Sequence, residues 1–283
     1  MPEGDAIFRT ARTLTRALAG KRVERFECAF APLSVAAENA QLVGRDVLEV
    51  TTRGKHVLMQ FSGELCLRTH MRMSGSWHIY RVGERWQRPR EEMRILLQAG
   101  EFVAVAFVVH EAELLTLREL EQVLGRLGPD VLGAEFDSAK AAERMLAAGA
   151  RPMCDVLLDQ RVLSGIGNVY KSELLFLARV HPLRTASSLD AATAKALTER
   201  AAQLLRVNVA SGATAGILTY AGLRRTTGRS NPGERLWVYE RAGKPCRECG
   251  TPIEMKRLGE HARSTYFCPQ CQALTPVVRA FGA

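Results

Sequence analysis

A helical period at the start of the chain gives way to a long region of alternating positions. Four apolar residues fall on one face of a predicted helix: Ile7, Ala11, Leu14 and Leu18. Asp5 can cap the start of this helix, and Gly20 can end it. Pro2 would therefore be held just before a rigid, buried element.

The period then changes to two, which is typical of half-buried strands. Mostly apolar side chains stand at every second position in residues 26–30, 57–61, 65–71, 93–97 and 103–109, with Thr69 as the polar exception. Turn signals such as Arg53-Gly54 and Ala99-Gly100 separate these segments. We expect an antiparallel sandwich or barrel in a first domain, residues 1–112, with helical spacing returning from Glu111.

A second, helical domain is expected over residues 127–225. Leu127-Gly128-Pro129-Asp130 breaks the pattern between a linker helix and this domain, whose helices are expected within 146–178 and 191–210. The polar stretch 226–232 then leads to a small third domain, residues 233–283. The predicted fold class is therefore α+β, with several domains.

The composition of the chain indicates the class of protein and the kind of partner it binds. The chain has 283 residues, 47% hydrophobic, which is enough to bury real cores. It lacks an apolar run of about 18 residues and the layout of a secretion signal, so we expect a soluble intracellular protein. From Ala221 onward eleven basic and five acidic residues supply +6 of the net charge of +9. This excess favours nucleic acid over a membrane, because no basic amphipathic helix with an aromatic face accompanies it.

Four of the seven cysteines form two Cys-x-x-Cys pairs that are eighteen residues apart: Cys246, Cys249, Cys268 and Cys271. This spacing is typical of a structural four-thiolate zinc site, which has no open coordination position. Structural zinc is worth about 10–16 kcal/mol in comparable small modules, so the metal would fold this unit. Basic residues near the pairs are expected on an outward β-hairpin: Lys256, Arg257 and Arg263. The remaining cysteines are expected to be core thiols: Cys28, Cys66 and Cys154.

Gly165 and Gly167 lie directly before Asn168, at a predicted helix start. Glycines there let backbone N–H groups and the helix dipole approach a phosphate closely. Asn168 can cap that helix or donate an amide hydrogen bond to the phosphate. A tight packing turn is the alternative interpretation.

The first residues contain a possible nucleophile. Removal of Met1 would leave Pro2 with a free secondary amine beside the carboxylate of Glu3. An α-amino group titrates near about 7.7–8.0, against about 10.4 for lysine, so much more of it can attack an electrophilic carbon at neutral pH. Amines that add to sugar carbons give iminium intermediates, which act as electron sinks. Many chains begin Met-Pro without chemical consequence, so this feature gains weight only from the motifs that accompany it.

Five motifs occur in order: Pro2-Glu3-Gly4, Arg53-Gly54-Lys55, His70-Met71-Arg72-Met73-Ser74-Gly75, Gly165-Ile166-Gly167-Asn168-Val169-Tyr170, and the run from Arg263 to Gln272. With the four cysteines they make the chain resemble, over nearly its whole length, the formamidopyrimidine-DNA glycosylase and endonuclease VIII family. The resemblance implies an N-terminal β-sandwich, a helix-two-turns-helix domain and a C-terminal zinc finger. It also implies that damaged DNA binds in a cleft between the halves.

The resemblance implies a role for each matching residue. Pro2 would attack C1′ of a damaged nucleotide, expel the base and form a Schiff base with the opened sugar, while Glu3 handles protons at the sugar. β-Elimination and then δ-elimination would release the 3′ and 5′ phosphates. Phosphate contacts are implied for the remaining matches. Lys55 would hold a phosphate near the lesion, and His70 would contact another phosphate. Asn168 and Arg263 would form a pair that clamps the phosphates flanking the flipped nucleotide, and Tyr239 would contact the DNA backbone.

The resemblance also bears on the substrate. Met73 matches the family's wedge, a flexible apolar side chain that fills the gap left by a flipped base. Gly4 fits the endonuclease VIII branch, although Asp5-Ala6 replaces the usual Pro-Glu. The branch that excises oxidised purines carries an Arg-Arg-Phe-Gly loop after the strand near residue 105, which the segment Val105–His110 lacks. We therefore expect oxidised pyrimidines to be favoured.

The expected function is that of a bifunctional DNA glycosylase and apurinic/apyrimidinic lyase of base excision repair, with one structural Zn²⁺. We expect a monomer that acts on damaged DNA, has no membrane partner, and works in the bacterial cytoplasm in association with the nucleoid. The alternative is a catalytically inactive zinc-finger DNA-binding protein. Asp5-Ala6 and the missing loop favour that alternative.

Overall fold

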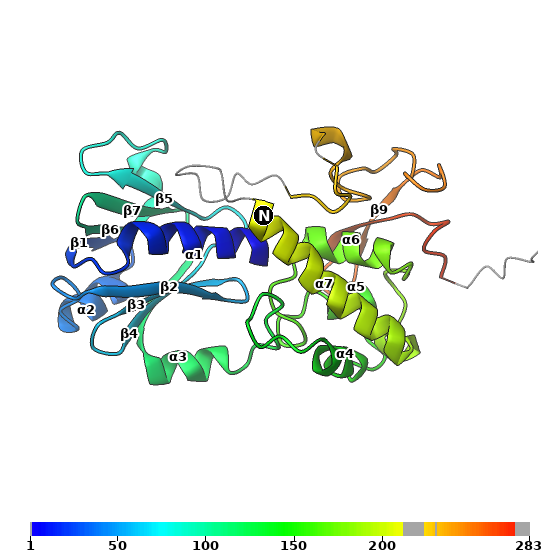
Figure 1. Ribbon diagram of the computed structural model, residues 1–283, viewed down its shortest axis with the longest axis horizontal. Helices are drawn as coiled ribbons and strands as arrows, with labels where there is room; N and C mark the ends of the chain where they lie inside the picture. Colours follow the sequence, from blue (N-terminus) through cyan, green and yellow to red (C-terminus); the bar gives the residue numbers. More distant parts are fainter. Residues whose placement is uncertain (1, 212–223, 230, 275–283) are drawn as a thin grey trace, which may run out of the picture. The chain divides into compact units, whose positions relative to one another are not determined.

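The computed structural model describes residues 2–211, 224–229 and 231–274 (Figure 1). Residues 212–223 of the expected second domain and 275–283 of the expected third lie outside the described residues, as do Met1 and Ser230. Two compact units divide the chain. Unit 1 comprises Met1–Arg126 and Val207–Gly222, and unit 2 comprises Leu127–Arg206 and Leu223–Ala283.

Helix α1 (Gly4–Leu18) opens unit 1 and buries the predicted apolar stripe. Its N-cap is Glu3, so the capping role expected for Asp5 is wrong. Asp5 lies in the first turn and is fully buried, because its carboxylate pairs with Arg9 at 3.2 Å. The same Arg9 nitrogen donates to the backbone carbonyl of Asn208 at 2.9 Å. Residue 5 thus anchors the start of α1 inside unit 1.

Two antiparallel four-stranded sheets confirm the expected sandwich. The first has the order β1 (Val23–Cys28), β6 (Met93–Ala99), β7 (Phe102–Phe107) and β5 (Ser76–Arg81). The second has the order β2 (Val47–Arg53), β3 (His56–Phe61), β4 (Leu65–His70) and β8 (Glu111–Thr116). Helix α1 packs against strands of both sheets, alongside which it runs in Figure 1. Leu14, Phe61, Trp77 and Leu97 lie in the shared core.

Strand β8 corrects the expectation for the chain after His110. Helical spacing was expected from Glu111, but residues 111–116 pair with β4 along its whole length. Ala112 and Leu114 pack on the core from alternate positions, which is the period of a strand. The helix α3 (Leu117–Leu124) begins only after a capping box formed by Thr116 and Glu119.

Unit 1 also contains a helix that the pattern of the sequence did not reveal, α2 (Ala31–Asn39). Its apolar residues show little helical periodicity, and a proline in its first turn starts it. A short 3-10 turn (η1, Arg90–Glu92) precedes β6. Cys66 is buried and Cys28 half-buried, as expected of structural thiols.

Unit 2 is helical at its core and carries one hairpin. Its helices are α4 (Ser138–Leu146), α5 (Met153–Val156), α6 (Asn168–Leu177) and α7 (Ala191–Ser211), whose last residues belong to unit 1. Short 3-10 turns are η2 (Ala186–Ser188) and η3 (Pro232–Glu234). Strands β9 (Glu254–Leu258) and β10 (Arg263–Phe267) pair antiparallel. The predicted basic residues of this hairpin are exposed: Lys256, Arg257 and Arg263.

Within the described residues, no helix is both long enough and apolar enough to cross a bilayer.

The stability of unit 1 depends on the α1 stripe. Leu14 is 0% exposed, so Leu14→Ala leaves a cavity and is expected to destabilise the protein by about 2–5 kcal/mol. Leu48 is 55% exposed, so Leu48→Ala should change stability by less than about 0.5 kcal/mol. Urea unfolding of both variants measures the difference, and equal losses would contradict the assigned core.

Candidate functional site

The candidate nucleophile precedes α1. Pro2 is half-buried, and Glu3 has an extended backbone at the helix N-cap. The carbonyl of Glu3 accepts the first helical hydrogen bond, from the Ile7 N–H at 3.0 Å. The Glu3 side chain is 0% exposed although it carries a carboxyl group. A buried carboxyl group adjacent to Pro2 is suited to proton transfer there.

Lys55 lies at the tip of the β2–β3 hairpin. Arg53 pairs with His56, so Gly54 and Lys55 form a two-residue turn. Gly54 has φ +60°, a conformation that suits glycine in the favoured hairpin turns. The tight turn therefore fixes the position at which the half-buried Lys55 leaves the sheet.

His70 ends β4 beside a cluster of positive charge. Its ring contacts that of His56 edge-on, with centroids 4.8 Å apart. Burial lowers the pKa of His70 to about 4; Glu111 opposes the shift, while Arg72, Lys55 and Arg68 add to it. Burial also lowers the pKa of His56 to about 3, assisted by His70 and the same cations.

The neutral ring of His70 has a defined tautomer. Its Nδ1 accepts the backbone N–H of Arg72 at 3.1 Å, so Nε2 carries the proton. A neutral Nε2–H donor close to Lys55 and Arg72 is an arrangement that suits an anion such as a phosphate. The structure thus brings the predicted residues Lys55 and His70 together.

Met73 lies in the turn that follows His70. Its side chain is 62% exposed, which is unusual for methionine and differs from a core position. The turn closes with a hydrogen bond from the Gly75 N–H to the Met71 carbonyl at 2.9 Å. A Cβ on Gly75 would lie 2.5 Å from that carbonyl oxygen, so the tight closure requires glycine. Buried Met71 anchors the turn while Met73 projects outward.

In unit 2, a rigid loop leads to the N-terminus of α6. Gly165 has φ +102°, and its N–H donates to the side-chain oxygen of Gln160 at 3.0 Å. The Gln160 amide in turn donates to the carbonyl of Ile166 at 3.0 Å. The N-cap is Gly167, so Asn168 is the first helical residue and does not cap the helix with its side chain.

Asn168 contacts β10 of the hairpin. Its Nδ2 donates to the carbonyl of Ser264 at 2.7 Å, and its Oδ1 accepts from Lys171 Nζ at 2.7 Å. Ser264 follows Arg263, which is exposed at the start of β10. The predicted pair Asn168 and Arg263 is therefore brought to one edge of unit 2.

The same helix fixes the segment that carries Tyr239. Glu173 is fully buried, and its carboxyl oxygens accept the backbone N–H groups of residues 237–239 at 2.8–2.9 Å. Burial raises the pKa of Glu173, and hydrogen bonds from Thr226 and these N–H groups oppose the shift. The ring of Tyr239 lies 4.9 Å from that of Tyr266 on β10. Tyr239 thus joins the Asn168 and Arg263 edge.

Sequence reasoning missed Lys171, Glu173 and His56. A signal existed for the first two, because charged residues in an otherwise apolar helix must find buried partners. Nothing in the sequence distinguished His56 from an ordinary strand residue. The predicted residues divide between the units: Pro2, Glu3, Lys55, His70 and Met73 lie in unit 1, and the others lie in unit 2.

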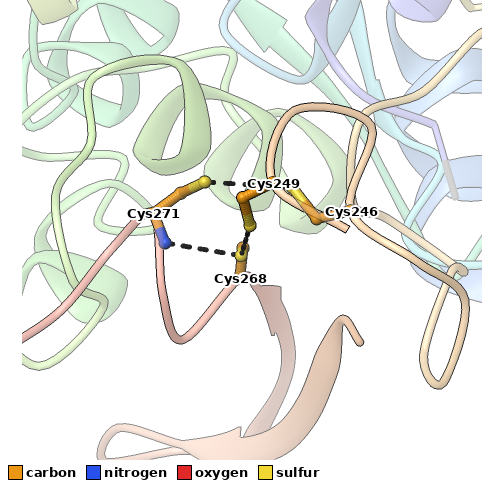
Figure 2. A group of neighbouring side chains, drawn as sticks. All are labelled: Cys246, Cys249, Cys268 and Cys271. Atoms are coloured by element: carbon orange, nitrogen blue, oxygen red, sulfur yellow. Dashed lines mark hydrogen bonds between the residues drawn. The ribbon is translucent and has the colours of Figure 1, made fainter. Parts of the chain in front are cut away.

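Four cysteine side chains converge in unit 2 (Figure 2). Cys246 and Cys249 come from one loop, and Cys268 and Cys271 come from the loop after β10. The four Sγ atoms lie within 4.8 Å of one another. The Sγ separations of 3.4 Å for Cys249–Cys268 and 3.9 Å for Cys246–Cys271 bracket the edge of about 3.8 Å that Zn–S bonds of about 2.3 Å give in a tetrahedron.

The residues therefore fit a structural Zn²⁺, and the donor set leaves no position for substrate. Cys246 and Cys268 pack in a small core with Phe176, Val238 and Ile253. Phe176 belongs to α6, so the zinc site is attached to the helix that carries Asn168. The metal supports the hairpin and takes no part in bond breaking.

Comparisons with known proteins agree along the chain. Residues 1–108 match the family model of the formamidopyrimidine-DNA glycosylase N-terminal domain, residues 127–219 that of the formamidopyrimidine-DNA glycosylase H2TH domain, and residues 243–274 that of the zinc finger found in FPG and IleRS. Two curated relatives cover nearly all of both chains. A probable endonuclease 8 2 of Streptomyces coelicolor is 39% identical over 96% of this chain and 94% of its own. The DNA-(apurinic or apyrimidinic site) lyase Nei2 of Mycolicibacterium smegmatis is 36% identical over 96% and 99%.

The fold also has solved counterparts. The Lactococcus lactis Fpg in a complex with DNA that contains an abasic site superposes with a TM-score of 0.81 at 20% identity, over 96% of this chain and 100% of that one. At this identity the likeness establishes the fold. The expected arrangement of β-sandwich, helix-two-turns-helix domain and zinc finger is confirmed.

Removal of the metal should dismantle the hairpin. Cys268 is fully buried and bears one of four ligands, so Cys268→Ser is expected to release zinc, whose binding supplies about 10–16 kcal/mol of folding free energy in small modules. Zinc content and circular dichroism measure the loss, and DNA affinity should fall with it. Cys28→Ser is the control, since Cys28 lies in unit 1. Intact lesion binding without zinc would refute the role given to the metal.

The two histidines should make stability depend on pH. An unfolded histidine has a pKa of about 6.5, whereas His70 and His56 titrate at about 4 and about 3 in the fold. The unfolded state therefore binds protons first, so their contribution is fully present above about pH 6.5 and is lost progressively as the pH falls from there through the folded pKa values of about 4 and about 3. Urea unfolding between pH 7 and 4 should show a shallower decline for a His56→Gln, His70→Gln double variant. An equally steep decline in that variant would contradict the assignment, and exposed His261→Gln is the control.

Proposed function

Because this chain belongs to the formamidopyrimidine-DNA glycosylase and endonuclease VIII family, we propose that it is a DNA glycosylase and apurinic/apyrimidinic lyase of base excision repair. The observation that carries the proposal is the start of α1, where the fully buried carboxyl group of Glu3 adjoins Pro2. Its substrate is damaged DNA.

The proposed reaction uses one amine twice. The secondary amine of Pro2 adds to C1′ as the C1′–N bond to the damaged base breaks and the electron pair leaves with the base. Glu3 relays protons at the sugar, and ring opening gives an iminium. The iminium acidifies the C2′ proton, so the 3′ phosphate leaves by β-elimination, and a δ-elimination releases the 5′ phosphate.

Phosphate contacts are assigned on both units. In unit 1, Lys55 and His70 share the positive cluster described above, which supports binding of a phosphate near the lesion. In unit 2, Asn168 and Arg263 are proposed to clamp the phosphates that flank the flipped nucleotide, and Tyr239 adds a contact to the backbone. Neutralisation of DNA phosphates by these basic side chains supplies binding affinity, which decreases as the salt concentration rises.

The exposed Met73 side chain is proposed as the wedge that fills the gap after base flipping. A preference for oxidised pyrimidines is supported by the connection between β7 and β8. It consists of residues 108–110 alone, and Phe107 before it is fully buried in the sheet. This connection is too short to supply a second wedge from an arginine and phenylalanine loop.

We further propose that the protein acts as a monomer in the bacterial cytoplasm, on nucleoid DNA. The departure at residue 5 does not argue for lost catalysis, because buried Asp5 is engaged with Arg9 in holding α1. Asp5, which stands where the family usually has proline, instead helps to hold the start of α1 through its ion pair with Arg9.

Covalent trapping tests the proposed chemistry. Abasic-site DNA mixed with the protein and borohydride is expected to give a stable adduct, because reduction fixes the iminium on Pro2. A variant that retains one residue before Pro2 should give none, since its nitrogen is then an amide. Formation of the adduct by that variant would contradict the role of Pro2, and no adduct from the wild type would favour a DNA-binding protein without catalysis.

Glu3→Gln separates the amine from the proton relay. It should retain trapping on preformed abasic sites, where no base has to leave, and lower excision of an oxidised pyrimidine by roughly 10²–10⁴-fold. Gel assays on the two substrates measure both outcomes.

A further inference from the structure

Lys171 is a buried lysine to which no role has been given. It lies on α6 and is 0% exposed. Its ammonium donates to Asn168 Oδ1 at 2.7 Å, to Thr265 Oγ1 at 2.7 Å and to the Ser264 carbonyl at 3.1 Å. An ammonium group has three N–H donors, so these three acceptors match it in number. Lysine is rarely buried in this way, because removing its charge from water is costly.

The first consequence is the orientation of the Asn168 amide. Lys171 can only donate, so the amide atom that faces it must be Oδ1. The Ser264 carbonyl can only accept, so the atom that faces it must be Nδ2, at 2.7 Å. One N–H of Nδ2 is thereby used within the protein, and the other is the donor that the proposed clamp assigns to a DNA phosphate. Without Lys171 the Ser264 carbonyl alone would hold the amide, so its orientation would be fixed by one hydrogen bond instead of two.

The second consequence concerns the strand that carries Arg263. Lys171 and Asn168 both hold the carbonyl of Ser264, the residue after Arg263. One turn of the helix thus sets the backbone from which the Arg263 side chain extends. Ser172 adds a further tie, because its hydroxyl accepts the N–H of Tyr266 at 3.3 Å.

We propose that Lys171 is a positioning residue for the phosphate clamp: it orients the Asn168 amide and the backbone beside Arg263 without touching DNA. This inference rests on the proposed function, since it takes Asn168 and Arg263 as phosphate ligands. It predicts that the buried ammonium group of Lys171 affects DNA affinity through the neutral side chain of Asn168.

The first experiment needs no DNA. In the full zinc-loaded chain, the two Nδ2 protons of Asn168 should give distinct NMR signals, one of them slow to exchange because it is bonded to Ser264. Lys171→Met, which keeps the length of the side chain and removes the ammonium, should accelerate that exchange at least about 10-fold. Unchanged exchange would overturn the proposal.

The second experiment is a double-mutant cycle with DNA that carries a stable abasic-site analogue. Lys171→Met should weaken binding about 10-fold in the wild-type background and less than about 2-fold when Asn168 is already alanine. Equal losses in both backgrounds would show that Lys171 acts on the fold alone. The exposed Lys140→Met, at 80% side-chain exposure, is the matched control for loss of one lysine.

The salt dependence separates positioning from direct contact. A lysine that neutralises a phosphate contributes about 0.9 to the slope of log K against log salt, so the slope should be unchanged in Lys171→Met. A fall of about 0.9 would make Lys171 a phosphate ligand and overturn the proposal.

Lys171→Gln guards against misfolding, because it keeps an N–H donor near Asn168 and should recover part of the affinity. Release of zinc by both variants would show a structural residue and also overturn the proposal. Borohydride trapping by the wild type reports separately on the proposed function. If the wild type is not trapped but the amide exchange and the double-mutant cycle give the expected results, catalysis is rejected and the positioning role of Lys171 is retained.

Discussion

Burial of charge is the constraint on which unit 2 depends. Helix α6 places Lys171 and Glu173 out of contact with water, where an ion without partners costs several kcal/mol even after relaxation. Each meets this cost with partners from a different part of the chain. The ammonium takes acceptors from β10, and the carboxyl group takes the N–H groups of residues 237–239. One helix therefore fixes two distant segments at once.

Unit 1 also holds ionisable groups together, but these groups lie nearer to solvent. Two histidines there stay neutral at physiological pH, chiefly because burial lowers the pKa of each ring, and the nearby charges of Lys55, Arg68 and Arg72 lower it further. Glu113 pairs with Arg68 and Glu111 pairs with Arg72, so carboxylates of β8 offset part of this positive charge. The cations are thus held in place within the sandwich, as the phosphate contacts proposed for Lys55 and His70 require.

Much of this organisation could be predicted from the sequence, because it follows from local periodicity and spacing. The stripe of α1, the alternating strands and the two cysteine pairs each encode their element within a short window. Helix α2 has no strong stripe, and β8 lies in a stretch whose spacing from Glu111 onward is interpreted as helical, so both depend on packing that a window cannot reveal. Two of the partners of Lys171, Ser264 and Thr265, lie more than ninety residues away in the sequence, beyond the reach of any motif.

The family likeness and the local geometry inform different questions. Similarity across the whole chain establishes the fold and the lineage. The geometry shows how this particular chain meets the requirements of that fold with its own residues, as when Asp5 and Arg9 secure the start of α1. The roles proposed for single side chains combine the two kinds of observation.

The turn from Met71 to Gly75 contains positions that tolerate substitution and positions that do not. Its base admits no side chain at Gly75, and buried Met71 belongs to the core, so neither end tolerates exchange. Between them Met73 is exposed, whereas Arg72 is tied to Glu111 by an ion pair and to His70 by its backbone N–H. Exchange of Met73 should therefore cost little stability, so descendants of this protein can vary the tip of the turn while its frame is kept.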